Sequence, residues 1–150
     1  MKIRRATKDD IIHIVEMLAD DELGSKREDY REPLPEKYFA AFSKIEKDLN
    51  QNLLVAISDN GEVVGTAQLT FIPYLTYQGG IRAQIEAVRI KSTHRSTGIG
   101  KKLFQWMITS AKEQGAHLIQ LTTDKARPDA LRFYEKLGFK ASHEGMKMHF

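Results

Sequence analysis

A loop with two glycines separates a strand pattern from a helix pattern in the middle of the chain. The segment "AQIEAVRI" (83–90) has the pattern of a strand, and apolar residues recur at helical spacing from Leu103 to Ala111. Between them lies "STHRSTGIGKK", which carries Gly98 and Gly100. Glycine has no Cβ, so the backbone can turn there and approach a bound group closely. This order predicts a strand–loop–helix unit of an α/β domain.

The start of the helix after this loop is suited to bind an anion. The first N–H groups of a helix lack partners within it, and the aligned peptide dipoles add about half a positive charge. A phosphate or pyrophosphate is therefore the natural occupant, with Arg95 and either Lys101 or Lys102 adding charge. The loop lacks the hydroxyl that a P-loop supplies to Mg²⁺ and the third glycine of a dinucleotide fingerprint. Taken alone, the loop is also compatible with a simple tight turn or with another phosphate-binding enzyme.

The remaining elements follow in order along the chain. Strands are expected at 2–6, 53–59, 62–72, 83–90 and 117–123, and helices at 11–20, 36–50, 98–115 and 128–138. Thr7 and Asp10 form a capping-box pattern, Asn60-Gly61 suits a hairpin turn, and Pro128 suits the first turn of a helix. We expect a long, mobile loop at 20–35 and a final hairpin at 139–150. The order predicts one domain over residues 1–150, of the α/β class with a mixed sheet.

Composition excludes several classes of protein. The chain has 150 residues, a net charge of +3 and no cysteine, so disulfides and thiolate nucleophiles are excluded. No apolar run approaches the roughly 20 residues that a bilayer requires, and the charged start "MKIRRATKDD" does not resemble a signal peptide. The histidines show no metal-ligand spacing. We expect a cytoplasmic protein without a metal site, membrane contact or nucleic-acid partner.

The charges are unevenly distributed. Acidic residues outnumber basic ones in the acidic segment, which we define as residues 20–36, and basic residues dominate 82–102. Solvated surface charge explains either cluster equally well. If the acidic segment lies beside an acceptor site, it would attract a cationic acceptor.

A second motif lies downstream, in "ARPDALRFYEKLGF" (126–139). Together with the glycine loop, it resembles the GNAT superfamily of acyl-CoA-dependent N-acetyltransferases. Arg95, Gly98 and Gly100 match the glycine signature of that family, and the later motif is matched by Ala130, Tyr134, Gly138 and Phe139. The resemblance implies a mixed, mostly antiparallel sheet whose two central parallel strands, "IEAVRI" and "HLIQLTT", splay apart.

The resemblance also implies a binding site for acetyl-CoA. The main chain of Val88, Arg89 and Ile90 is expected to pair with the pantetheine arm. The backbone amides of the loop are expected to hold the pyrophosphate; they belong to Ser96, Thr97, Gly98, Ile99, Gly100 and Lys101, with Arg95 beside them. Arg127 stands where the family often has asparagine, and it is expected to contact the phosphates.

Two side chains are candidates for proton transfer. Glu86 is the only acid in the strand, and a carboxylate there can act as a base for the protonated amine, although a structural pairing with Arg82 is the alternative. Tyr134 matches the family's general acid, and the alternative is a ring that packs on the core. With no cysteine to carry an acyl group, transfer is expected to be direct.

These expectations define an N-acetyltransferase that uses a small-molecule or peptide amine as acceptor. The alternative is a non-catalytic acyl-CoA-binding regulatory module that keeps the pocket. The aromatic residues Phe71, Tyr74 and Tyr77 are candidates for a wall of the acceptor pocket, or for strand-end packing. The sequence leaves open whether the chain forms a homodimer.

Overall fold

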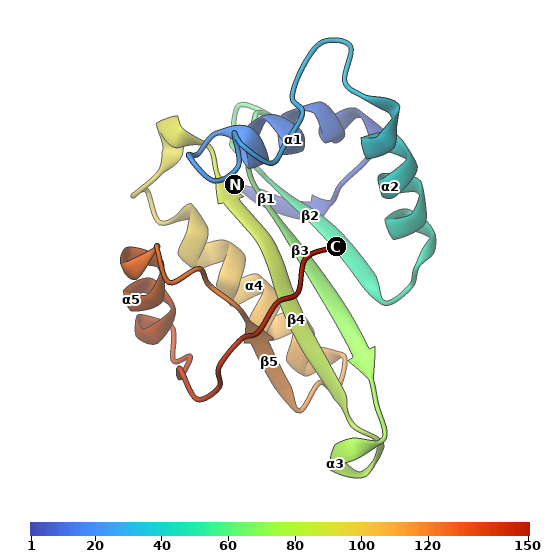
Figure 1. Cartoon of the computed structure of the whole chain (residues 1–150), viewed down its shortest axis with the longest axis vertical. Coiled ribbons are helices and arrows are strands. Elements are labelled where there is room, and N and C mark those ends of the chain that lie inside the picture. The colour runs from blue at the N-terminus through green and yellow to red at the C-terminus, as the bar shows by residue number, and fades with distance from the viewer.

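The computed structural model describes residues 1–150 as a five-stranded sheet with helices on both faces (Figure 1). The sheet order is β1-β2-β3-β4-β5; β5 is parallel to β4, and all other neighbours are antiparallel. The strands are β1 (Lys2–Arg5), β2 (Gln51–Ile57), β3 (Val63–Pro73), β4 (Ile81–Ile90) and β5 (Leu118–Leu121). The expected mixed, mostly antiparallel sheet is confirmed. The parallel pair lies at one edge of the sheet rather than at its centre, because no strand forms after β5.

The four longer helices are α1 (Ile11–Ala19), α2 (Glu36–Lys47), α4 (Ile99–Glu113) and α5 (Pro128–Lys136). Three short helical segments complete the chain: η1 (Lys8–Asp10), α3 (Thr76–Gly79) and η2 (Ser92–His94). In Figure 1, α5 lies beside α4 on the side of β5. Helix α1 contacts β3 and β4, and α2 contacts β2. The helices predicted around Pro128 and after Gly98 are therefore confirmed.

The sheet buries an apolar cluster on each face. Leu54 and Val55 are neighbours in β2, and because side chains alternate along a strand they join different clusters. Leu54 packs with Leu103, Phe104 and Met107 of α4. Val55 packs with residues of α1 and α2, namely Ile11, Ile14, Val15 and Phe42. The face that carries α1 is called the α1 face below, and the opposite one the α4 face.

The polar interactions at the N-terminal end are as the capping-box pattern predicts. The Thr7 N–H donates to Asp10 Oδ2 at 2.7 Å, and the Arg4 guanidinium donates to both carboxylate oxygens of Asp10. In the β2–β3 hairpin, the Ser58 N–H donates to the Glu62 carbonyl oxygen at 2.9 Å. Gly61 has a φ of +87° there, so the predicted turn is confirmed.

A β-bulge in β4 determines which of its side chains share a face. Glu86 pairs with Gln68 and Arg89 pairs with Thr66, so Ala87 and Val88 together stand opposite one residue of β3. Ala87 has a φ of +53°. Because paired residues in an antiparallel ladder point to the same side, Glu86 and Arg89 both lie on the α1 face. Without the extra residue, side chains three positions apart would point to opposite faces.

The two parallel strands separate after a short paired stretch. β4 and β5 pair from Arg82–Leu118 to Ile85–Leu121, and β5 then ends while β4 continues to Ile90. The edge of residues 86–90 that faces away from β3 therefore has no strand partner. This separation is the splayed pair that the sequence resemblance implied.

Two other segments differ from expectation. Residues 141–150 are all exposed and form no strand, so the predicted final hairpin is wrong. A two-stranded hairpin needs an apolar face to pack on, and this segment contributes no side chain to either apolar cluster. The expected loop before β4 contains α3, where Tyr77 and Gln78 adopt left-handed φ values of 53° and 59°.

Candidate functional site

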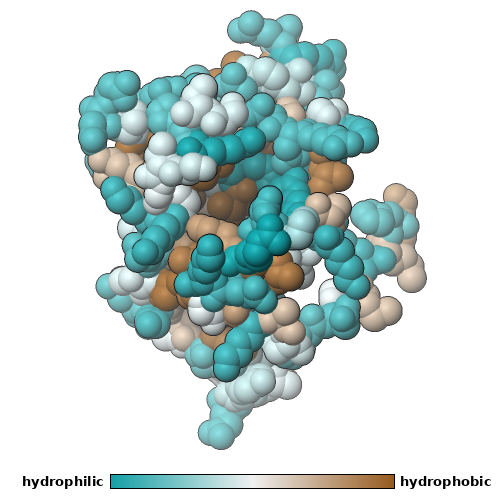
Figure 2. All heavy atoms as spheres, turned by 90° about the vertical axis from the view of Figure 1, so that its left-hand side faces the viewer, coloured by the Kyte–Doolittle hydropathy of each residue, from teal (hydrophilic) through white to brown (hydrophobic).

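A cavity of about 330 Å³ lies where β4 ends and α4 begins. Figure 2 shows this side of the molecule, with a hollow that has apolar atoms in its depth and hydrophilic groups around it. Most of the predicted cofactor residues line the cavity: Val88, Arg89, Ile90, Arg95, Ser96, Gly98, Ile99, Gly100 and Lys101. Tyr134, predicted as a general acid, lines the same cavity. The structure thus brings together residues from β4, the glycine loop, α4 and α5.

The start of α4 presents a row of unpaired donors. None of the backbone N–H groups from Ser96 to Lys101 donates a hydrogen bond within the chain. Gly98 caps the helix with a φ of +85°, and Gly100 faces the cavity, where a Cβ would come within 3.6 Å of Phe133. These groups fit a pyrophosphate, because an anion at this helix end accepts hydrogen bonds and meets the positive end of the helix dipole.

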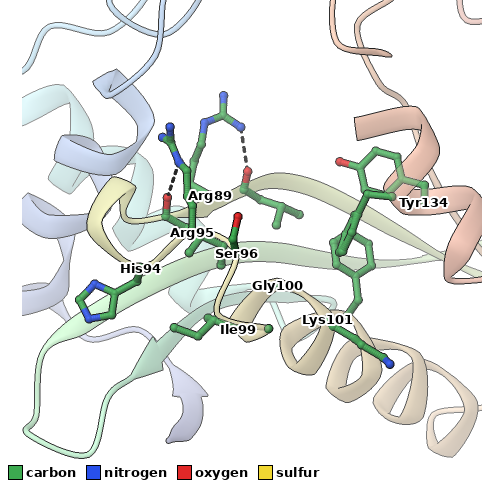
Figure 3. Close-up of a pocket in the computed structure, with 13 residues that line it drawn as sticks. Arg89, His94, Arg95, Ser96, Ile99, Gly100, Lys101 and Tyr134 are labelled. Carbon is green, nitrogen blue, oxygen red and sulfur yellow. Dashed lines mark hydrogen bonds between the residues drawn. The ribbon is translucent and has the colours of Figure 1, made fainter. Parts of the chain in front are cut away.

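The free edge of β4 presents main-chain carbonyl oxygens, which are hydrogen-bond acceptors, to the same cavity. Arg89 donates from its guanidinium to the Val88 carbonyl oxygen at 2.8 Å, and Arg95 Nε donates to the Ile90 carbonyl oxygen at 3.3 Å (Figure 3). Both arginine side chains therefore occupy main-chain acceptors on the strand expected to pair with pantetheine. A ligand amide that bound these carbonyls would have to replace the two contacts.

Three charged residues form a cluster on the α1 face. The Asp21 Oδ2 atom accepts a hydrogen bond from Arg127 at 2.6 Å and lies 3.3 Å from Arg89 Nε. Burial would raise the pKa of Asp21, but the hydrogen bonds from the Gly24 N–H and Arg127 hold that pKa below its usual range. Burial lowers the pKa of Arg89, and the nearby Asp21 offsets only part of that effect. We call Asp21, Arg89 and Arg127 the arginine–aspartate cluster.

Tyr134 combines a packed ring with an unbonded hydroxyl. The ring lies against Phe104, Phe133 and Phe139, with centroids 5.5 to 6.2 Å apart, as the packing alternative proposed. The hydroxyl forms no hydrogen bond within the chain, and in Figure 3 it extends from α5 toward the side of the cavity that carries Arg89. Burial raises the Tyr134 pKa, although Arg127 and Arg89 act in the opposite direction. The phenol therefore holds its proton at neutral pH.

Glu86 does not line the cavity, but it lies where β4 and β5 separate. It is the first residue of β4 after the last pair with β5, so it stands where the two strands separate. Its side chain is exposed on the α1 face. No cation lies within ion-pair distance of it, so the alternative pairing with Arg82 is not formed.

Two other predicted residues do not line the cavity. Arg127 is turned toward Asp21, and the Thr97 hydroxyl donates to the His94 carbonyl oxygen at 2.6 Å. The Lys101 side chain points away from the cavity in Figure 3, so only its backbone contributes.

Sequence reasoning missed Phe104 and Phe133 as cavity residues, because their positions in apolar helix patterns indicated only core packing. The aromatic residues proposed for the acceptor pocket lie elsewhere. Phe71 is buried in the apolar cluster under α4, and Tyr74 and Tyr77 stack with His117 at the opposite end of β4. These residues therefore serve packing.

Most charges of the acidic segment are paired within the chain. Asp20 lies 3.5 Å from Arg95, and Glu28 lies 3.0 Å from Arg27. The other ion pairs of this segment are Asp21 with Arg89 and Arg127, Glu22 with Lys26, and Asp29 with Arg31 and Lys37. These acidic side chains therefore form ion pairs with basic side chains of the same chain. No helix is long and apolar enough to cross a membrane.

Comparison with known proteins identifies the family. The sequence model of the Acetyltransferase (GNAT) family matches residues 16–139, and the chain therefore belongs to this family. The match includes β4, the glycine loop and Tyr134, so it covers the whole of the cavity described above.

Individual relatives carry acetyltransferase names. An aminoalkylphosphonate N-acetyltransferase from Salmonella typhimurium is 37% identical over 56% of this chain and 54% of its own length. A glucosamine 6-phosphate N-acetyltransferase from Trypanosoma brucei brucei is 32% identical over 59% of this chain and 58% of its own. The chain thus spans just over half the length of these curated relatives.

One solved structure is similar over its entire length. The crystal structure of a transcriptional regulator from Bacillus halodurans C-125 is 62% identical, covers 99% of both chains and has a TM-score of 0.96. Its fold is therefore the same as that of the present chain.

Proposed function

We propose that this protein is an N-acetyltransferase that moves an acetyl group from acetyl-CoA directly to the primary amine of a small molecule or peptide. The observation that carries this proposal is the row of unpaired N–H groups at the start of α4, beside a strand edge without a partner. Membership of the GNAT family supports it, as do the names of the two curated relatives.

The donor site would be formed mainly by main-chain groups. The N–H groups from Ser96 to Lys101 would bind the pyrophosphate, with Arg95 adding charge, and the carbonyl groups of Val88 and Ile90 would accept from the pantetheine amides. When bound, acetyl-CoA supplies an activated acetyl group as a thioester. Phe104 and Phe133 line the cavity with apolar surface and help to exclude water.

Glu86 and Tyr134 are assigned to the two proton transfers. An amine of the lysine type has a pKa of about 10.4, so it arrives protonated and needs a base. Glu86 is exposed at the point where β4 and β5 separate, and its carboxylate would accept that proton directly or through water. The Tyr134 hydroxyl holds a proton beside the cavity and would donate it to the departing sulfur.

The absence of cysteine gives this proposal a direct test. A thiol reagent added to the protein, acetyl-CoA and a panel of amines detects only released coenzyme A, because the chain itself has no thiol. We expect thiol release that depends on the amine, with a product heavier by one acetyl group in mass spectra. Thermal stabilisation by coenzyme A without release by any amine would refute the transferase assignment.

That negative outcome would favour the second candidate, a non-catalytic acyl-CoA-binding regulatory module. One observation gives it weight: the protein that is 62% identical over its whole length is called a transcriptional regulator. The two candidates share the donor site and differ only in turnover. Stabilisation by ATP or NAD but not by coenzyme A would reject both.

A further inference from the structure

The arginine–aspartate cluster contains more positive charge than its carboxylate can balance. Arg89 and Arg127 share Asp21 Oδ2, while Asp21 Oδ1 already accepts the Gly24 N–H at 2.6 Å. One carboxylate therefore serves two guanidinium groups. Each buried cation normally requires a compensating charge or a full set of hydrogen bonds.

Arg89 is the less satisfied of the two cations. Its side chain is only 13% exposed, and its buried Nε forms no hydrogen bond. One guanidinium nitrogen contacts the Val88 carbonyl oxygen, which belongs to the donor site. A second anion beside Arg89 would supply the missing partner, because a guanidinium binds carboxylate and phosphate oxygens with directed hydrogen bonds.

The cluster lies on the α1 face of the sheet, as Glu86 does. The bulge in β4 places Arg89 on the α1 face, whereas α4 and its N–H row lie against the other face. Arg127 does not line the cavity at the start of α4. Arg89 and Tyr134 line the same cavity, so an anion bound to Arg89 would lie near the reacting groups.

The same bulge places Glu86 and Arg89 on one face, three residues apart. At about 3.3 Å per residue, their backbone positions are separated by roughly 10 Å at most. Glu86 would face the amine and Arg89 the anion, so a short molecule that carries both groups matches this pair. Resting on the proposed function, we propose that Arg89 and Arg127 bind an anionic group (phosphate, phosphonate or carboxylate) of the amine acceptor.

The test uses pairs of amines that differ only in the anionic group. Phosphoethanolamine is compared with ethanolamine, and β-alanine with 3-amino-1-propanol, on the wild type and on Arg127→Gln, Arg127→Lys and Arg132→Gln. Arg132 lies on α5, which begins directly after Arg127, is exposed and pairs with Asp129, so it serves as the control. Thermal shifts with the same amines, in the presence of coenzyme A, measure binding without turnover.

We expect the wild type to prefer the anionic member of each pair. Arg127→Gln should raise KM for that member about tenfold, with less effect in Arg127→Lys, because a charge-assisted contact is lost. KM for the neutral member and for acetyl-CoA should stay within about twofold, and Arg132→Gln should match the wild type. The thermal shift by phosphoethanolamine should decrease in parallel.

Three results decide between the proposals. If Arg127→Gln raises KM for acetyl-CoA instead, the cluster binds the donor's phosphates and the anionic-acceptor site is rejected. If both members of each pair react equally in all variants, the site is rejected while the transferase function stands. If no amine reacts but phosphoethanolamine stabilises the protein through Arg127, the anion site stands and the transferase function fails.

Discussion

Arg95 Nε donates a hydrogen bond to the carbonyl oxygen of Ile90 at 3.3 Å. The same guanidinium also donates to the Asp20 carbonyl oxygen at 3.2 Å, so one side chain joins the end of α1, the end of β4 and the glycine loop. These contacts fix the loop without using any N–H group between Ser96 and Lys101. Contacts within the chain therefore hold the loop in place and leave these N–H groups unpaired.

Gly100→Ala separates the stability of the fold from binding of the donor. Alanine in a helix is favoured over glycine by about 1 kcal/mol, and the new methyl group would meet Phe133 and Ile90 only at ordinary contact distance. We expect an unchanged or higher Tm but weaker binding of coenzyme A by titration calorimetry, because the methyl group enters the cavity. Thr109→Ala, on the exposed side of α4, should raise Tm without this loss.

Tyr134→Phe should remove turnover while preserving the fold. The ring keeps its contacts with Phe104 and Phe139, and the lost hydroxyl has no partner within the chain. We expect kcat to fall about a hundredfold with little change in Tm or in KM for acetyl-CoA. Tyr38→Phe is the control. The Tyr38 hydroxyl accepts a hydrogen bond from the Asp29 N–H and donates one to Glu28, so this variant should have a lower Tm and an unchanged kcat.

Glu86→Gln should reduce kcat by about a hundredfold near neutral pH if the carboxylate accepts the amine proton. The difference in kcat between Glu86→Gln and the wild type should decrease as the pH approaches about 10, because the amine then loses its proton to solvent. Rate measurements from pH 7 upward check this, with Glu113→Gln on the exposed end of α4 as the control. A deficit that is constant with pH would exclude Glu86 as the base.

Asp10→Asn tests the electrostatics at the N-terminal end. Burial would raise the pKa of Asp10, but hydrogen bonds from Arg4 and Thr7 outweigh it and lower the pKa. The stabilisation from this depressed pKa is present above about pH 4, the unfolded value, and is lost as the pH falls through the folded value. In urea unfolding, we expect the free energy of unfolding of Asp10→Asn to be about 2 kcal/mol lower than that of the wild type at pH 7. This difference should be smaller at pH 3.

Ala87→Gly tests the bulge. Ala87 has a φ of +53°, a conformation that costs a residue with a Cβ roughly 1 kcal/mol and costs glycine nothing. We expect Ala87→Gly to be neutral or slightly stabilising in urea unfolding, and the β-branched Ala87→Val to be destabilising. Equal stability of the two variants would mean that the left-handed conformation is not retained in solution.

The sequence predicts the elements and the glycine loop that lines the cavity, because both follow from local patterns. Helical spacing, the Asn60-Gly61 turn and the glycines at the start of α4 each act over a few residues. The bulge at Ala87 was not predicted, since no glycine marks it and the extra residue is visible only from the pairing with β3. Helix patterns concealed the cavity role of Phe104 and Phe133.

The arginine–aspartate cluster could not be predicted for a different reason. Asp21 and Arg127 are separated by 106 residues, and only the meeting of the α1–α2 loop with the start of α5 brings them together. The acidic segment suggested attraction of a cationic acceptor, whereas its acids pair with arginine and lysine side chains of the chain itself. A charge pattern predicts a surface potential but not which charges neutralise one another.

The row of backbone N–H groups at the start of α4 affects how mutations can change such a protein during evolution. The hydrogen-bond donors of this loop are backbone N–H groups. Replacing the side chain of Ser96, Thr97 or Ile99 therefore leaves all of these N–H groups in place. The opposite face relies on individual side chains such as Arg89, which a single substitution removes. Under the proposed function, recognition of acetyl-CoA is therefore robust to side-chain substitution, whereas the choice of acceptor can change through a single substitution.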